Sequence, residues 1–411
     1  MIVDRRRLLL GASAMAAAAS VPLRARAQDK PIRIGVLSDM SGPFSADTGP
    51  GSLVSAQLAV EDFRATNPGF DIEILSGDMQ SKPDLVASIS SSWYEWDGVD
   101  MIVDVPLSSG AFAVAGFAER LNKVAIFTGA GSSDITGKSC GPNHVHWVYD
   151  TYANARAISR SLIGQGKDSW YFIQADYAFG ENLVRDASAE ILAAGGKILG
   201  VDKHPSPNTS DFSSFLMSAQ AANPKVLALA NSSVEAATCL KQALEFGIQD
   251  SGITIAALQF AITMTHATGL EVVQGLNIAE TYYWDLNDGT RDFAMRWEKQ
   301  RPGLRPNPMQ AGVYSAVLHY LKAVAAAGVD VAKNDGAAVV RKMKEIPTDD
   351  PLFGKGLVRE DGRKIHDYHL FQVKKPSEST QPWDYYHHVA SLPAAEAFRP
   401  LADGGCPMIP T

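Results

Sequence analysis

The sequence is poor in cysteine, with three in 411 residues and none before Cys140. An exported lipoprotein needs a cysteine for lipid attachment near its N-terminus, so the sequence argues against a lipid-anchored chain. Three cysteines cannot all pair. Cys239 falls on the apolar stripe of a predicted helix and is expected to be a buried free thiol. Cys140 and Cys406 lie in turn-rich segments beside prolines, and an oxidising compartment would let them form a disulfide.

Long apolar runs and an excess of basic residues are also absent. Nothing after residue 27 approaches the roughly 20 consecutive apolar residues that span a bilayer, so we expect no integral membrane segment there. The formal net charge is −8, and it becomes −8 − 4 = −12 without the first 27 residues, which carry five Arg and one Asp. This acidic balance makes nucleic acid and acidic membrane surfaces poor partners.

The first 27 residues have the composition of an export signal. Arginines at 5–7 precede an apolar stretch, and Ala25-Arg26-Ala27 resembles a cleavage site, so we expect cleavage after Ala27. The arginines resemble a twin-arginine signal, although Asp4 and Leu8 depart from that pattern. The choice between the twin-arginine and the general export route stays open, and we expect a periplasmic protein.

From Pro31 onward, short apolar runs alternate with longer amphipathic ones. The pattern predicts strands at 32–37, 71–75, 100–105 and 123–128, and again at 169–174, 196–202, 225–230, 252–258 and 275–280, with helices between them. Such alternation is typical of parallel sheets covered by helices. About 384 residues exceed one comfortable core, so the sequence predicts an α/β fold with two doubly wound, Rossmann-like lobes.

Two polar turns follow neighbouring predicted strands. Ser108 and Ser109 come after the strand at 100–105, and Ala130 and Ser132 come after the strand at 123–128. Ligands of open parallel sheets bind beyond the carboxyl ends of the strands, where helix amides and hydroxyls can hold an anion. Either turn alone is better explained as helix capping. The pair together predicts a carboxylate site.

Catalytic and metal motifs are missing. The "GAGSSD" segment has Asp134 where a nucleotide-binding loop has glycine, and no GxSxG motif occurs. His144 and His146 are interpreted as ordinary strand residues. A structural zinc site needs four well-spaced ligands, and no pair of cysteines accompanies these histidines or His387 and His388. We therefore expect no enzyme activity, no metal and no cofactor.

The segments "IRIGVLSDMSGPFSADTGPGSLVSAQLAVEDF", "SSG", "FTGAGSSDITG", "DYAFGENL" and "AGVYSAVLHYLKAV" resemble, in this order, the solute-binding proteins of branched-chain-amino-acid-type ABC importers. The resemblance runs from about Ile32 to about Val389. It implies a type I periplasmic binding fold, a clamp of two lobes with three hinge crossings. The expected parts are lobe 1 at 28–149 and 282–350, lobe 2 at 150–281 and 351–390, and a tail at 391–411.

The resemblance also implies roles for individual residues. Ser108, Ser109, Ala130 and Ser132 match the turns that hold a ligand carboxylate in this family. Phe179 falls where relatives place an aromatic ring over the ligand, with Tyr177 beside it, and Tyr152 and Tyr314 are weaker candidates. The implied partners are a small-molecule carboxylate and an inner-membrane ABC permease, and we expect a monomer.

One departure from the family bears on the ligand. Relatives that bind amino acids pair the ligand ammonium with an acid of the second lobe, because a buried cation needs a counter-charge. The corresponding strand ends here offer Asn231, Gln259 and Phe260, and Tyr282 lies near the second expected crossing. The sequence therefore favours an aromatic carboxylate resembling benzoate or cinnamate. Amino acids or short amides, a sensory role and, least of all, a hydrolase are the alternatives.

Overall fold

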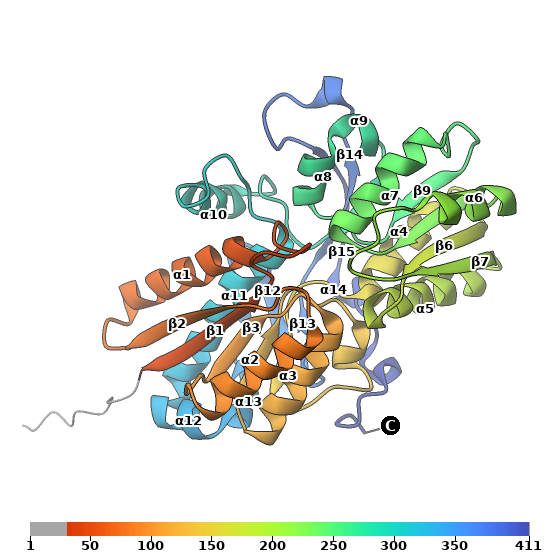
Figure 1. Ribbon diagram of the computed structural model, residues 1–411. Helices are drawn as coiled ribbons and strands as arrows, with labels where there is room; N and C mark the ends of the chain where they lie inside the picture. Colours follow the sequence, from red (N-terminus) through yellow and green to blue (C-terminus); the bar gives the residue numbers. More distant parts are fainter. Residues whose placement is uncertain (1–30, 411) are drawn as a thin grey trace, which may run out of the picture.

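The computed structural model describes residues 31–410, so the predicted export signal lies outside the described residues. The described chain forms two α/β lobes, each built on a parallel sheet (Figure 1). The predicted fold class is confirmed. No helix among these residues has both the length and the apolar composition needed to cross a membrane.

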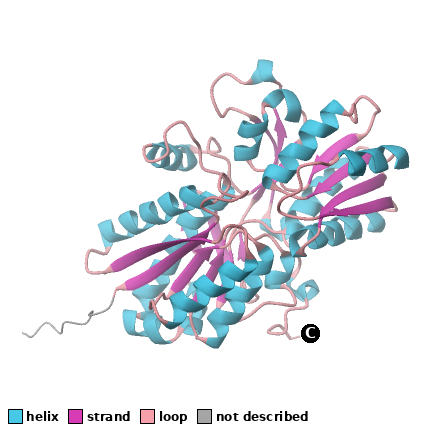
Figure 2. Cartoon of the chain, in the orientation of Figure 1, coloured by secondary structure: helices cyan, strands magenta, loops and turns pink. Residues whose placement is uncertain are grey.

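The first lobe contains a five-stranded parallel sheet in the order β2-β1-β3-β4-β5. Its strands are β1 (Ile32–Ser38), β2 (Ile72–Asp78), β3 (Met101–Asp104), β4 (Val124–Phe127) and β5 (His144–His146). The central strands β3 and β4 are buried along their whole length, as expected where helices cover both faces. Figure 2 shows those helices on either side of the sheet. They are α1 (Gly49–Thr66), α2 (Pro83–Glu95), α3 (Ser108–Arg120), α11 (Pro308–Ala327), α12 (Val329–Asn334) and α13 (Gly336–Glu345).

The second lobe contains a four-stranded parallel sheet in the order β7-β6-β8-β9. Its strands are β6 (Ser169–Ala175), β7 (Lys197–His204), β8 (Val226–Ala230) and β9 (Thr254–Ala257). Its helices are α4 (Thr151–Ile163), α5 (Ala178–Ala193), α6 (Ser213–Ala222), α7 (Ser233–Glu245), α8 (Ile262–Thr268) and α9 (Leu270–Val273).

One strand expected in the second parallel sheet lies elsewhere. The run at 275–280 forms β10 (Asn277–Glu280), which pairs antiparallel with β14 (Tyr368–Val373), and β14 pairs antiparallel with β15 (Tyr386–Leu392). The expectation was wrong because an alternating pattern predicts a strand but does not identify its partner, which here comes from the last part of the chain.

The chain passes between the lobes three times: between β5 and α4, between β10 and α10 (Asp288–Glu298), and between β13 (Lys364–Ile365) and β14. A small sheet of β11 (Thr348–Asp350), β12 (Gly354–Val358) and β13 precedes the third passage, and a single bridge joins His146 to Arg363 beside it. The exact residue limits of the lobes stay predictions.

The C-terminal segment returns to the first lobe after β15. It forms α14 (Ala394–Ala397) and a short 3₁₀ helix (Leu401–Gly404), and Cys406 is joined to Cys140 by a disulfide with a Cα–Cα distance of 5.5 Å. Cys239 is free and buried in α7, as predicted. The disulfide therefore ties a segment that leaves β15 to the lobe that contains β4.

Candidate ligand-binding cleft

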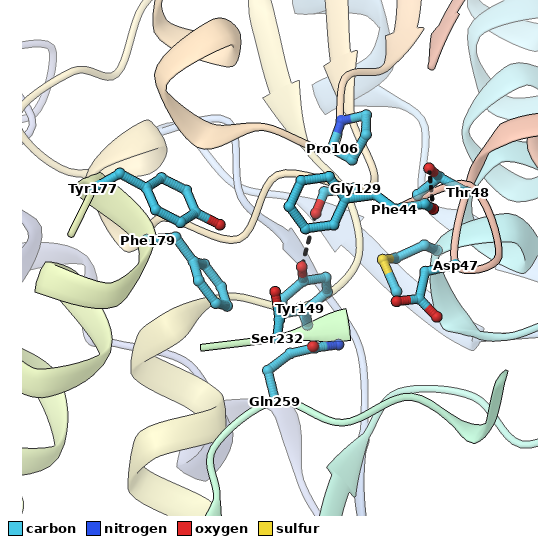
Figure 3. A pocket seen from close by; sticks show the side chains of 11 residues that line it. Phe44, Asp47, Thr48, Pro106, Gly129, Tyr149, Tyr177, Phe179, Ser232 and Gln259 are labelled. Atoms are coloured by element: carbon cyan, nitrogen blue, oxygen red, sulfur yellow. Dashed lines mark hydrogen bonds between the residues drawn. The ribbon is translucent and has the colours of Figure 1, made fainter. Parts of the chain in front are cut away.

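A narrow cavity of about 10 Å³ lies between the two lobes (Figure 3). We call it the aromatic cavity. The first lobe and the first chain passage contribute Phe44, Asp47, Thr48, Pro106, Gly129, Tyr149 and Met309, and the second lobe contributes Tyr177, Phe179, Ser232 and Gln259. All but Met309 of α11 lie at or just beyond the ends of β1, β3, β4, β5, β6, β8 and β9, the edge where ligands of open parallel sheets bind.

The loop between β1 and α1 supplies three of the lining residues. Asp39 fixes this loop, because its carboxylate accepts hydrogen bonds from the backbone N–H groups of Gly42 and Phe44 at 3.1 and 3.0 Å. The Ser81 hydroxyl donates a third bond to the same carboxylate at 2.6 Å. This turn holds the Phe44 ring and the Asp47 side chain against the cavity (Figure 3).

Four aromatic rings surround the aromatic cavity. Tyr177 and Phe179 are stacked with their ring centroids 6.0 Å apart and their planes inclined by 27°. The Tyr149 hydroxyl donates to the Gly129 carbonyl at 2.7 Å. Burial raises the pKa of both Tyr149 and Tyr177 well above the ordinary value, so these phenols stay neutral. The cavity thus offers flat apolar faces with polar tips.

The Asp47 carboxyl group is the one acid that lines the aromatic cavity within the described chain. It is almost fully buried and accepts a hydrogen bond from the Thr263 hydroxyl of the second lobe. Burial raises the pKa of Asp47 to about 6. No Lys, Arg or His of residues 31–410 lines this cavity, so the charge of Asp47 has no basic partner there.

A second acid, Glu280, lies close to Asp47 at the end of β10. Burial raises the pKa of Glu280 well above its ordinary value, and the neighbouring Asp47 charge adds to the shift. Within the described chain, neither of its carboxyl oxygens has a hydrogen-bond partner. The prediction from the sequence rested only on the ends of β8 and β9, where no acid lines the cavity; Asp47 comes from the loop after β1 and Glu280 from the end of β10.

Strained backbone borders the aromatic cavity. Asp104 and Val105, at the end of β3, have φ values of 87° and 52°, and Ser233, next to Ser232, has a φ of 52°. Such angles are uncommon for residues other than glycine and are most costly for the β-branched Val105. Hydrogen bonds hold this turn, because the Asp104 carboxylate accepts from the hydroxyls of Ser38 at 2.6 Å and Thr128 at 3.0 Å.

The predicted carboxylate turn is close to the aromatic cavity, but its polar groups have protein partners. The Ser108 hydroxyl accepts from the Ser132 N–H at 3.3 Å, and the Ala130 carbonyl lies 2.7 Å from the His146 ring nitrogen Nε2. The Ser132 hydroxyl donates to the Asn182 amide oxygen of α5 at 3.3 Å. Ser109 lies in the first turn of α3. In this arrangement none of the four lines the cavity.

Two further contacts join this turn to α5. The Ser133 hydroxyl donates to Asp186 at 2.8 Å, and Arg185 forms an ion pair with Asp134 at 2.8 Å. We call the three contacts Ser132–Asn182, Ser133–Asp186 and Asp134–Arg185 the α5 latch. They cross from the first lobe to the second, as does the hydrogen bond from the Ser233 hydroxyl to the Pro43 carbonyl at 2.9 Å. The lobes are therefore closed on each other.

The remaining predicted residues divide between the cavity and the interior. Tyr177, Phe179 and Gln259 line the aromatic cavity. The others do not, because their side chains are engaged elsewhere: the Tyr152 hydroxyl accepts from Arg156, Asn231 contacts His204, Phe260 packs in the core, Tyr282 packs on Phe293 and Phe353, and the Tyr314 hydroxyl donates to Asp62.

Phe44, Asp47, Tyr149 and Met309 line the cavity but were not singled out from the sequence. A signal for the first two existed, because the segment "SGPFSADTGPG" also follows the carboxyl end of a parallel strand. Met309 lies in the first turn of α11, far along the chain, and carries no polar signal. Within residues 31–410 no group of three or more His, Cys, Asp or Glu side chains is placed to hold a metal ion.

Comparison with known proteins identifies the fold and the family together. A family model described as periplasmic binding protein matches residues 31–380. The chain belongs to this family. A periplasmic binding protein from Burkholderia mallei is 39% identical, with a TM-score of 0.88 over 92% of this chain and 99% of its own. A protein from Burkholderia xenovorans is 33% identical, with a TM-score of 0.80 over 92% of this chain and 99% of its own. It is described as a branched chain amino acid ABC transporter periplasmic ligand-binding protein.

More distant structures share the fold alone. A solute binding protein of an ABC transporter from Rhodopseudomonas palustris, solved in complex with benzoate, is 18% identical, with a TM-score of 0.77 over 88% of this chain and 96% of its own. No curated protein matches the chain. The predicted membership of the type I periplasmic binding proteins of ABC transporters is confirmed. Members of this family bind small molecules and deliver them to membrane permeases.

Proposed function

We propose that this protein captures a small aromatic carboxylate in the periplasm and delivers it to an inner-membrane ABC permease. The observation that carries the ligand class is the ring of four aromatic side chains, Phe44, Tyr149, Tyr177 and Phe179, around the interlobe cavity. Each favourable aromatic pair adds about 0.5–1.5 kcal/mol beyond the burial of apolar area. A flat ring is the ligand body that such walls recognise best.

The two ends of the ligand would meet different groups. Its carboxylate would take the hydrogen bond that the Ser132 hydroxyl now gives to Asn182, with Ser108, Ser109 and the start of α3 adding donors. Its other end would face Asp47, which favours a hydrogen-bond donor. A hydroxyl-bearing acid such as 4-hydroxybenzoate fits both ends. The closed, empty cavity of about 10 Å³ has no room for a ring, so the lobes must open to admit the ligand. Closure of Tyr177 and Phe179 around the ring then gives the ligand-bound form that a permease recognises.

An α-amino acid is the second candidate, and Asp47 is the observation that favours it. An ionised Asp47, with Glu280 behind it, would supply the counter-charge for a ligand ammonium. The relative from Burkholderia xenovorans, 33% identical, is described as a branched chain amino acid binding protein. Leucine and valine therefore belong in any ligand screen.

Export through the signal at residues 1–27, with cleavage after Ala27, would place the mature protein in the periplasm as a monomer, and the bound ligand would be released unchanged. A sensory module would use the same closure but pass it to a receptor. Permease and ATPase genes beside the coding gene would favour transport over sensing.

A thermal-shift screen of residues 28–411 tests the ligand class. Any ligand that binds only the folded state raises the melting temperature, by an amount that grows with ligand concentration over Kd. We expect stabilisation by 4-hydroxybenzoate, benzoate or cinnamate, and a weaker effect from the corresponding amides. Stabilisation by leucine or valine without any effect of the aromatic acids would overturn the aromatic assignment in favour of the amino acid.

A further inference from the structure

A second cavity, of about 390 Å³, lies beside the aromatic cavity on the other side of the β1–α1 loop. We call it the Arg301 cavity. Ala46 lines it while the next residue, Asp47, lines the aromatic cavity. Its other walls come from α8, the end of α10, the start of α11 and Trp383. In Figure 1, α8 and α10 both lie above α1. The space is within the range of small-molecule sites.

Two arginines line this cavity with incomplete hydrogen bonding. The Nε atoms of Arg301 and Arg305 are both buried and without a partner in the described chain. Arg305 is held in place, because its Nη1 lies 2.5 Å from the Glu298 carboxylate and its guanidinium is 5.0 Å from the centre of the Trp284 ring. The Arg301 side chain is half-buried: its Nε is shielded from solvent, while its Nη groups reach solvent and have no hydrogen-bond or ion-pair partner among residues 31–410. Buried donors without acceptors are rare and costly.

The remaining walls are largely apolar. Met40, Leu304, Trp297 and Trp383 contribute apolar surface, and the Trp383 ring stacks on His266 with a centroid distance of 4.0 Å and an interplanar angle of 12°. No Asp or Glu of the described chain lines this cavity. The Arg301 cavity is therefore basic and partly aromatic, whereas the aromatic cavity contains an acid and no basic side chain.

We propose that the Arg301 cavity is an accessory site for a second organic anion, a carboxylate or sulfonate with a flat apolar body. The anionic group would accept from the free guanidinium of Arg301, and the apolar body would lie against Met40 and Trp297. Because α8 packs on α7 of the second lobe and Trp297 is bonded to Gly51 of the first, the occupant contacts both lobes and favours their closure. This site does not depend on which ligand the aromatic cavity binds.

Calorimetric titration with naphthalene-2-sulfonate tests the site, since a sulfonate stays charged at every useful pH. We expect the Arg301→Gln variant to bind this probe at least tenfold more weakly than the wild type. A second variant, Ala267→Trp, fills the cavity from the exposed side of α8 without removing a charge, and we expect the same loss. The matched control is Arg291→Gln on α10. Arg291 is partly exposed and forms ion pairs with Asp285 and Asp288, and this variant should bind the probe within twofold of the wild type.

Three results would overturn the accessory site. In the first, Arg301→Gln and Ala267→Trp leave the affinity for the probe unchanged, whereas Phe179→Ala abolishes binding. The anion would then occupy the aromatic cavity, and the proposed function would stand. Another is equal affinity for the uncharged naphthalene-2-sulfonamide. The third is no binding of the sulfonate at millimolar concentration by a folded wild-type protein.

Discussion

The α5 latch and the aromatic cavity lie on the same interface between the lobes but differ in how their polar groups are paired. In the latch, every named hydroxyl or carboxylate has a partner on the opposite lobe. At the cavity, Asp47 accepts a hydrogen bond from Thr263 of the second lobe but has no basic partner, and the carboxyl oxygens of the nearby Glu280 have no hydrogen-bond partner in the described chain. Paired polar groups hold the lobes closed, whereas unpaired ones mark where a ligand is expected.

Removing the disulfide should have the largest effect on stability. The Cys140→Ser, Cys406→Ser double variant opens a link with a sequence separation of 266 residues. We expect the free energy of unfolding to fall by about 2–5 kcal/mol, because the unfolded chain regains conformational entropy. Chemical denaturation measures the loss. A wild type treated with reductant should match the variant, and an unchanged unfolding midpoint in both would show that the tether contributes nothing.

Breaking the α5 latch should have the second-largest effect on stability. Asp186 accepts bonds from the hydroxyls of Ser133 and Thr151 at 2.8 and 2.7 Å and is almost fully buried. We expect Asp186→Ala to reduce the unfolding free energy by about 3 kcal/mol, since two buried hydroxyls lose their acceptor and Arg185 loses one of its two carboxylate partners. The control is Asp176→Ala, an exposed partner of Lys203, which should change stability by less than about 0.5 kcal/mol. Equal effects of the two changes would contradict the latch.

The Ser132→Ala variant asks whether the latch turn also holds the ligand. If the ligand carboxylate takes the place of Asn182, binding should weaken by roughly 1–3 kcal/mol through loss of a charge-assisted hydrogen bond. Titration calorimetry with the best ligand of the screen measures this, with the exposed Ser92→Ala as the control. An affinity equal to that of the wild type would remove Ser132 from the binding site and leave it in the latch alone.

The smallest expected effect is the change of the binding free energy with pH. Its sign distinguishes an aromatic acid from an amino acid as the ligand. Folding raises the pKa of Asp47 to about 6. Protonated Asp47 therefore stabilises the folded state fully at pH values below the pKa of Asp47 in the unfolded chain, and this contribution is lost as pH rises through about 6. Ionisation should weaken binding of benzoate or cinnamate, which offer Asp47 no hydrogen-bond donor, by about 1 kcal/mol and strengthen binding of an amino acid. Calorimetry at pH 5 and pH 8 measures the change, and Asp47→Asn should abolish it. A pH dependence that persists in Asp47→Asn would exclude Asp47 as its source.

The sequence predicted the two lobes because each strand is an apolar run and each helix an amphipathic one, and these periodicities are local. It misplaced β10, because pairing with β14 is a contact between residues about ninety positions apart that no local pattern records. The same limit explains the site. Tyr177, Phe179 and Gln259 follow strands of the second lobe, and sequence position alone places them near the cleft.

Asp47 and Tyr314 show what sequence position does not decide. Asp47 lies in a loop rich in small residues, and only the turn fixed by Asp39 directs the neighbouring side chains at the cavity. Tyr314 lies in a segment that resembles the family, but its hydroxyl donates to Asp62 at 2.6 Å and its ring packs on Phe293. Which way a side chain points depends on partners that are distant in sequence.

The most direct test of the central claim is a calorimetric titration of 4-hydroxybenzoate into the wild type and into Phe179→Ala, with Phe246→Ala on the exposed end of α7 as the control. We expect binding by the wild type and the control, and at least tenfold weaker binding by a folded Phe179→Ala, because one wall of the aromatic cavity is removed. Equal affinity in all three proteins would contradict the claim that the ligand ring lies in the aromatic cavity.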